Sequence, residues 1–193
     1  MYTKASLLSR YMVPVFLFPL LLLSTCGDLF DPEPPDPGPV VSLDSGTEFY
    51  YRHTENSDTS FIHLKIIGDT LIQEKSYAIF DNGVYKRTAD GVVYRWRDGG
   101  EIIEMNFRVA IGDSVRFLGE KLLVTNVERK EMFGFQQSVI SVSNSMMAQD
   151  TTITGIYSTL YGIVSYTRSA SGITSGDTLL GAIVSGQSYG TMP

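Results

Sequence analysis

The chain has 193 residues, of which 43% are hydrophobic and 19% charged, a balance typical of a globular protein with one well-packed domain. Its formal net charge is −6, and since a protein that binds nucleic acid needs a basic surface to meet the phosphates, we expect no nucleic-acid partner. The single cysteine excludes an internal disulfide, while eleven Tyr, ten Phe and eighteen Gly favour strands and tight turns over helices.

Residues 1–25 have the layout of a secretory signal peptide. Lys4 and Arg10 lie in a segment without acids, and the run from Tyr11 to Leu23 that follows is apolar. A transmembrane helix needs roughly 20 apolar residues, and two prolines inside this shorter run would break a helix. We therefore expect a cleaved signal rather than a permanent membrane span.

The apolar run ends in Leu23-Ser24-Thr25-Cys26, which resembles the lipobox of bacterial lipoproteins, although Thr25 stands where Gly, Ala or Ser is usual. The resemblance implies that Cys26 receives a diacylglyceryl group and acyl chains such as palmitate, and becomes the new amino terminus. Each buried methylene contributes about 0.8 kcal/mol, so several acyl chains would hold the protein at a bilayer. The alternative is an ordinary signal peptide followed by an unrelated, buried cysteine.

Residues 26–46 are predicted to form a disordered tether. Five of the eight residues from Pro32 to Pro39 are proline, which favours a polyproline II spacer over helix or sheet. The tether also carries the acids Asp28, Asp31, Glu33 and Asp36. These acids are either solubilising charge or, by resemblance, the surface-export signal of Bacteroidota lipoproteins. We expect a lipid-anchored protein of the outer membrane that faces the periplasm or the cell surface.

Residues 47–193 are expected to form a single all-β domain. The dipeptides Asn82-Gly83, Asp90-Gly91 and Asp98-Gly99 recur at a spacing of eight and suit two-residue type I′ hairpin loops. They predict an antiparallel meander from about Lys75 to Arg108, although Asp98-Gly99-Gly100 also admits a three-residue loop. The predicted fold is a curved sheet, a half-barrel or a sandwich built on this meander.

Pairing the strands around the first two turns predicts which side chains share a face of the meander. Phe80 would lie opposite Tyr85, and Tyr85 opposite Trp96. The next row of this face would consist of Ala78, Arg87 and Tyr94. The other face would carry Ile79, Lys86 and Arg95, with Asp81, Val84 and Arg97 beside them. We expect the aromatic face to pack against the core.

Outside the meander, six further strands are predicted. They are Phe61–Ile67, Lys121–Arg129, Phe135–Val142, Thr151–Ser158, Leu160–Arg168 and Leu179–Val184. A Gly-Asp pair recurs at Gly68, Gly112 and Gly176, where each glycine is expected to take a positive φ in a tight turn that opens a strand. The unequal spacing of these pairs argues against a repeat protein. Residues 143–150 are compatible with a helical turn.

Several short stretches in this order resemble a class of uncharacterised β-rich exported lipoproteins of the Bacteroidota. They are Gly68-Asp69-Thr70, Asp90 to Tyr94, Glu104 to Phe107, Ile111-Gly112-Asp113, Tyr161 to Tyr166 and Leu180 to Ile183. These are turn and core residues of low specificity. The resemblance implies a compartment and a fold, and the class has no known activity.

The sequence offers few groups for catalysis. His63 alternates with Ile62 and Leu64 and should point away from their face, and we expect His53 to be a rim residue. Glu101 and Glu104 have odd spacing in one predicted strand, which would place them on opposite faces and make them poor partners for glycoside chemistry. No motif for a nucleophile, a metal or a cofactor is present, so we expect neither catalysis, metal nor cofactor.

Two features are weak candidates for a binding site. The first is a local basic patch of Lys86, Arg87, Arg95 and Arg97, which is either the solvated outer face of a sheet or a site for an anionic glycan or lipid headgroup. The second is the abundance of tyrosine, which suits core packing, sugar platforms and protein interfaces and includes Tyr50, Tyr51, Tyr157, Tyr161, Tyr166 and Tyr189. The leading hypothesis is a non-enzymatic envelope lipoprotein whose domain is structural or binds an envelope protein, glycan or lipid. The alternatives are a half-barrel that carries an apolar ligand and, third, a hydrolase.

Overall fold

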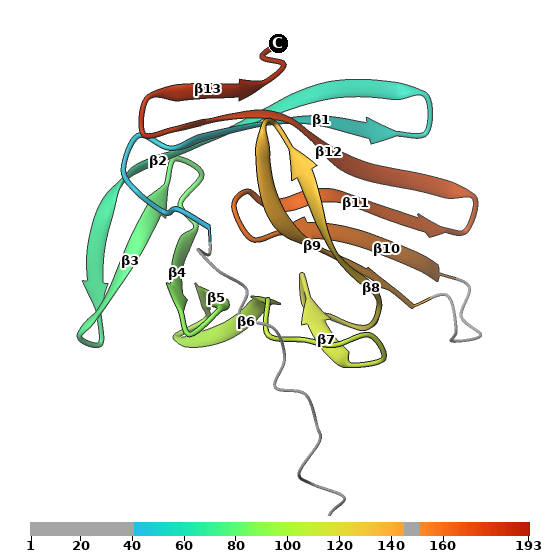
Figure 1. Ribbon diagram of the computed structural model, residues 1–193, viewed down its shortest axis with the longest axis horizontal. Coiled ribbons are helices and arrows are strands. Elements are labelled where there is room, and N and C mark those ends of the chain that lie inside the picture. The colour runs from blue at the N-terminus through green and yellow to red at the C-terminus, as the bar shows by residue number, and fades with distance from the viewer. Residues whose placement is uncertain (1–40, 145–150) are drawn as a thin grey trace, which may run out of the picture. The chain divides into compact units, whose positions relative to one another are not determined.

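A computed structural model describes residues 41–144 and 151–193 of the chain (Figure 1). The predictions for the signal peptide, for lipidation of Cys26, for the proline-rich part of the tether and for most of the helical turn at 143–150 lie outside these residues. In the described ranges, no helix has the length and apolar character needed to cross a membrane.

The described domain is all-β, as predicted. Its strands are β1 (Glu48–Glu55), β2 (Asp58–Ile72), β3 (Lys75–Phe80), β4 (Tyr85–Ala89), β5 (Val92–Arg97), β6 (Gly100–Asn106), β7 (Ser114–Phe117), β8 (Glu120–Met132), β9 (Phe135–Ser143), β10 (Thr151–Ser158), β11 (Gly162–Ala170), β12 (Ile173–Val184) and β13 (Gln187–Gly190). The six strands predicted outside the meander are thus confirmed, most of them with longer bounds than expected.

All described strands belong to one antiparallel sheet that curls into a nearly closed barrel (Figure 1). Its order is β6-β5-β4-β3-β2-β1-β12-β11-β10-β9-β8-β7, and β13 adds to the carboxyl half of β12. The two halves of the sheet join through β1 and β12, which are far apart in the chain. The end strands β6 and β7 contact each other without entering a common ladder.

The register of the β3–β4 hairpin differs from the predicted one by one residue. Tyr85 lies opposite Ile79, and the amide of Phe80 donates to the Val84 carbonyl, so three residues rather than two form the loop. A shift of one residue moves a strand's side chains to the other face. The prediction that Tyr85 and Trp96 share the core face with Phe80 is therefore wrong.

The next two hairpins follow the predicted turn chemistry. Asp90 and Gly91 have φ of 49° and 71°, and Asp98 and Gly99 have φ of 53° and 81°, as a type I′ loop requires. Gly100 pairs with Arg97, so the Asp98-Gly99 loop has two residues and the three-residue alternative is wrong.

The recurring Gly-Asp pairs are not equivalent. Gly112 has a φ of 96° in the turn before β7, as predicted. Gly68 and Gly176 lie inside β2 and β12, so the predicted turns there are wrong. A Cβ on Gly176 would lie 2.6 Å from the Tyr166 carbonyl oxygen, so this glycine allows β11 and β12 to approach closely.

Aromatic side chains fill the interior on the side of β7 to β11. The Tyr157 ring stacks at 5.4 Å on Phe117 and meets Phe107 edge-on at 5.3 Å, and all three residues are buried. Gly155 makes room for this stack, since a Cβ there would lie 2.5 Å from Cε1 of Phe117. The rings of Phe107, Phe117 and Tyr157 thus pack against one another between these strands.

The described chain packs onto the domain before β1 begins. Val41 is buried, and Leu43 packs against the same core. The Gly46 amide donates to the carbonyl of Ile66, which ties this segment to β2. Packed residues therefore begin within the 26–46 range that was predicted as tether.

Candidate functional site

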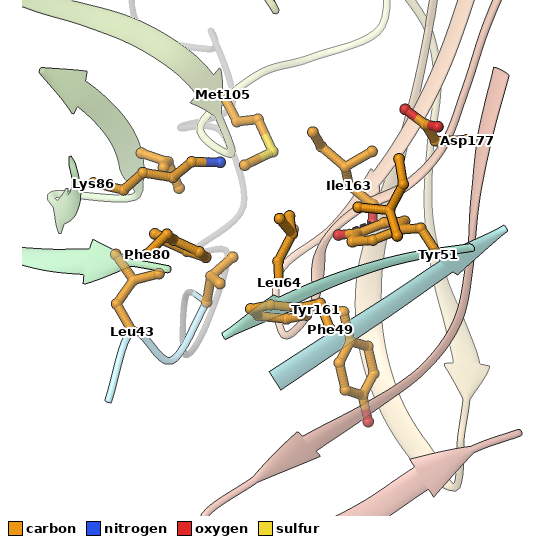
Figure 2. Close-up of a pocket in the computed structure, with 14 residues that line it drawn as sticks. Leu43, Phe49, Tyr51, Leu64, Phe80, Lys86, Met105, Tyr161, Ile163 and Asp177 are labelled. Carbon is orange, nitrogen blue, oxygen red and sulfur yellow. Dashed lines mark hydrogen bonds between the residues drawn. The ribbon is translucent and has the colours of Figure 1, made fainter. Parts of the chain in front are cut away.

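The other half of the interior holds a cavity of about 120 Å³, here called the inner cavity (Figure 2). Its walls come from the segment before β1 and from β1 to β6, β11 and β12. The apolar side chains among them belong to Val41, Leu43, Phe49, Tyr51, Ile62, Leu64, Phe80, Val93, Met105, Tyr161 and Ile163. A dry cavity of roughly 150 Å³ holds a molecule the size of benzene, so this space fits a ring or a short alkyl chain.

One cation projects into this apolar space. Lys86 on β4 pairs with Ala78 on β3, so the two side chains lie on the same face of the sheet. Figure 2 shows the Lys86 amino group directed toward Met105. Its Nζ lies 5.2 Å from the centre of the Phe80 ring. Lys86 lies on the inner face because the observed register of the β3–β4 hairpin differs by one residue from the predicted one, which had placed it on the outer face.

Glu104 on β6 neutralises Lys86. Nζ donates a hydrogen bond of 3.0 Å to Oε1 and also lies 2.9 Å from Oε2, while the two side chains are only 16% and 4% exposed. Oε2 is in electrostatic contact with the ammonium group but makes no hydrogen bond of acceptable geometry. The pair therefore leaves one buried carboxylate oxygen able to accept a further hydrogen bond.

Polar groups also stand at the opposite side of the inner cavity, from which Asp177 faces it (Figure 2). Asp177 Oδ1 lies 2.7 Å from Nδ1 of His53, which is about one third exposed, as expected for a rim residue. The Tyr51 hydroxyl donates to the Ile163 carbonyl at 3.2 Å. Burial, together with the negative charges of Glu104 and Asp177, raises the pKa of Tyr51, so this phenol stays neutral.

A second hollow of about 360 Å³, here called the polar pocket, adjoins the first. Two carboxylates and three hydroxyl side chains contribute to its lining, from Asp44, Asp69, Ser45, Ser76 and Thr88. Leu43 and Lys86 line both hollows, so they form the wall between the inner cavity and the polar pocket.

The four basic residues singled out in the sequence do not share one face. Lys86 and Arg95 pair across β4 and β5 on the inner face, whereas Arg87 pairs with Tyr94 on the outer face. Arg97 is exposed, and its Nε lies 3.1 Å from Oδ2 of the neighbouring Asp98. Their role in binding stays a prediction, and Lys86 alone of the four reaches the inner cavity.

Arg87 takes part in a cluster on the outer face, here called the outer cluster. Glu101 accepts hydrogen bonds from Arg87 Nε, from the Tyr77 hydroxyl at 2.5 Å and from Lys75 at 2.7 Å. These bonds, with that of Arg87 the strongest, lower the pKa of Glu101 to about 2. Glu101 and Glu104 thus face opposite sides of β6, as their odd spacing predicted.

A smaller network surrounds His63 on the outer face of β1 and β2. The ring stacks on Tyr50 at 4.6 Å, and Nε2 lies 2.9 Å from Glu48 Oε2. Lys65 and Tyr50 also bond to Glu48 and, with His63, lower its pKa to about 2. His63 points away from Ile62 and Leu64, as predicted, because these two line the inner cavity.

The sequence singled out three residues of the inner cavity, Lys86 for a surface role and Tyr51 and Tyr161 among the tyrosines that suit core packing or binding. The other wall residues carry no chemical signature in the sequence, because aliphatic and aromatic residues at alternate positions equally describe a filled core. Within residues 41–144 and 151–193, no three His, Cys, Asp or Glu side chains converge as ligands for a metal ion. No family model matches the sequence, and no match is found among curated proteins.

Proposed function

We propose that the chain is a bacterial lipoprotein of the outer membrane, acylated at Cys26, whose β-domain is a non-enzymatic binding module. The lipobox-like Leu23-Ser24-Thr25-Cys26 and the acids that follow it support the anchor. The observation that carries the binding function is the inner cavity, an apolar space inside a one-sheet domain that contains a single, neutralised ammonium group. Small-molecule sites combine apolar walls with a few placed polar groups in this way.

The anchor is tested by expressing the full chain in a bacterium fed a palmitate analogue that can be coupled to a dye. The unchanged chain should carry the label and sediment with the membranes. The variant Cys26→Ser should lose the label. Labelling that survives Cys26→Ser would contradict the assignment of Cys26 as the acylated residue.

The binding function is tested by native mass spectrometry of the full chain purified from the envelope. We expect a co-purifying small molecule that is lost in Ile163→Phe, which fills the inner cavity, and kept in Ile103→Phe. Ile103 is the matched control because it lies on the outside of β6 and is 40% exposed. A ligand retained equally by both variants would place binding outside the inner cavity.

The second candidate function is a carrier for a small apolar ligand, which the same apolar walls favour. A carrier must release what it binds, so it should transfer a fluorescent apolar ligand between two populations of vesicles. A static binding module should retain the ligand. The transfer rate of the full chain therefore separates the two functions.

A further inference from the structure

The two hollows differ in chemistry on either side of a shared wall. The inner cavity is lined by aliphatic and aromatic groups, and the polar pocket by carboxylates and hydroxyls. Leu43 and Lys86 are the side chains common to both. An arrangement of this kind matches a molecule that is apolar at one end and polar at the other.

The Leu43 part of the wall is held by packing alone. Among the described residues, Val41 and Leu43 make no hydrogen bond, and the Ser42 hydroxyl bonds only to Asp44 in the same segment. The first tie to the sheet comes at Gly46, which donates to Ile66. The Leu43 side chain can therefore move aside without breaking a backbone hydrogen bond.

The charges around the polar pocket disfavour an anionic head. Lys86 and Arg87 line it, but each is already paired, with Glu104 and Glu101. Asp44 and Asp69 have no ion-pair partner among the described residues, so the pocket offers a surplus of acceptors. A further carboxylate or phosphate would meet these acceptors without a free cation to balance it.

The hydroxyl side chains favour a head that both donates and accepts hydrogen bonds. Ser45, Ser76 and Thr88 do both, whereas an ammonium head would leave their donors unused and would meet Lys86 and Arg87, which also line the pocket. The buried Oε2 of Glu104 lacks a hydrogen bond and would accept one from a hydroxyl near Lys86. A polyhydroxyl group meets all of these requirements at once.

We propose that the two hollows together bind a single-chain amphiphile with an uncharged, hydroxyl-rich head, of the alkyl glycoside class. The terminal part of the alkyl chain occupies the inner cavity, the head occupies the polar pocket, and the rest of the chain passes between them where Leu43 turns aside. This inference rests on the proposed binding function and gives that function a ligand class.

The test uses three amphiphiles with eight carbons in the chain, the carboxyl carbon of octanoate included, each kept below its micelle concentration. They are octyl glucoside, octanoate and octylammonium, titrated by calorimetry into the full chain carrying Cys26→Ser, without detergent. We expect octyl glucoside to bind at least tenfold more tightly than either charged compound. Equal or tighter binding of octanoate or octylammonium would overturn the assignment of the head.

Two variant pairs locate the bound molecule. Ile163→Phe should abolish binding of octyl glucoside, and the matched Ile103→Phe on the outer face should leave it unchanged. Asp69→Asn should weaken binding about tenfold, and Leu43→Ala should strengthen it severalfold by removing part of the wall. Equal binding by Ile163→Phe and Ile103→Phe would contradict the site, and the two milder variants decide the matter if Ile163→Phe does not fold.

The outcome also separates this inference from the proposed function. A co-purifying ligand that Ile163→Phe removes, together with no binding of octyl glucoside, would keep the binding function and overturn the ligand class. No co-purifying ligand and no binding of any octyl compound would overturn both.

Discussion

The inner and outer faces of strands β4 and β6 carry the same kind of ion pair in different surroundings. On the inner face, Lys86 pairs with Glu104 beside the apolar cavity. On the outer face, the next residue, Arg87, pairs with Glu101 in a cluster that also includes Tyr77 and the largely exposed Lys75. The two cations are similarly shielded, so the pairs differ mainly in the exposure of the carboxylates, which is 4% for Glu104 and 19% for Glu101.

The inner pair should be costly to break and easy to replace. In a buried setting the desolvation of both charges offsets most of their attraction, so the pair adds little net stability, whereas a lone buried charge is strongly unfavourable. In the outer pair, the Glu101 carboxylate keeps some contact with water and has three donors around it. It should contribute modestly to stability and depend on pH.

The largest effect is expected for Glu104→Gln. This change leaves the Lys86 ammonium group without its counter-charge beside the Phe80 ring. Breaking a buried pair costs about 3–5 kcal/mol, so the free energy of unfolding in urea should fall by about that amount. Glu120→Gln, at an exposed acid of β8, is the control and should change it by less than about 0.5 kcal/mol. A loss below about 1 kcal/mol in Glu104→Gln would show that the inner pair is solvated.

Replacing both partners of the inner pair should restore most of that stability. The double variant Lys86→Met/Glu104→Leu removes both charges and keeps apolar volume, so its unfolding free energy should return to within about 1–2 kcal/mol of the unchanged protein. Urea denaturation of Lys86→Met, of Glu104→Leu and of the double variant gives the coupling energy between the two side chains. A double variant as unstable as Glu104→Gln would mean that the cavity cannot repack without the pair.

For the outer pair, Glu101→Gln should cost about 1–2 kcal/mol at pH 7, because one charged acceptor of three hydrogen bonds becomes a neutral one. The folded protein lowers the pKa of Glu101 from 4.5 to about 2. The carboxylate therefore stabilises the fold above pH 4.5, and this contribution disappears as the pH falls from 4.5 toward 2. Thermal unfolding should show the two proteins converging over that range. A constant difference down to pH 2 would rule out the carboxylate as its source.

The smallest effect concerns salt. Raising the ionic strength from about 0.1 M to about 1 M shortens the screening length from about 10 Å to about 3 Å. The Lys75 side chain is 47% exposed, so its coupling energy with Glu101 should fall by a few tenths of a kcal/mol. That between Lys86 and Glu104 should not change measurably. Double-variant cycles at both ionic strengths measure the two couplings, and equal salt dependence would contradict the contrast between the faces.

The sequence predicted the strands well because their apolar alternation and turn dipeptides are local signals. It failed where the loop length was ambiguous. At Asn82-Gly83, Asp81 joins the loop and shifts the register by one residue, which places Tyr85 and Trp96 on the outer face. Other tight turns were not identified because no Asn or Asp precedes their glycine, as at Phe133-Gly134 and Leu118-Gly119, where both φ values are positive.

The inner cavity could not be predicted from local sequence patterns, for a different reason. Its walls come from residues as distant as Val41 and Asp177, and they meet only because β1 pairs with β12 and the sheet curls. Lys86 was singled out as part of a basic patch, but its face depended on the register of the β3–β4 hairpin. A one-residue error in a turn thus moved the central polar group of the site to the wrong side of the sheet.

We propose that the inner face binds a ligand and that the outer face stabilises the fold. Methyl NMR of the full chain carrying Cys26→Ser, titrated with octyl glucoside, tests this claim directly, because Met105 and Ile163 line the inner cavity while Ile103 lies outside on β6. We predict that the Met105 and Ile163 methyl signals shift together with one dissociation constant while the Ile103 signal stays in place. Unmoved Met105 and Ile163 signals, or a shift confined to Ile103, would contradict it.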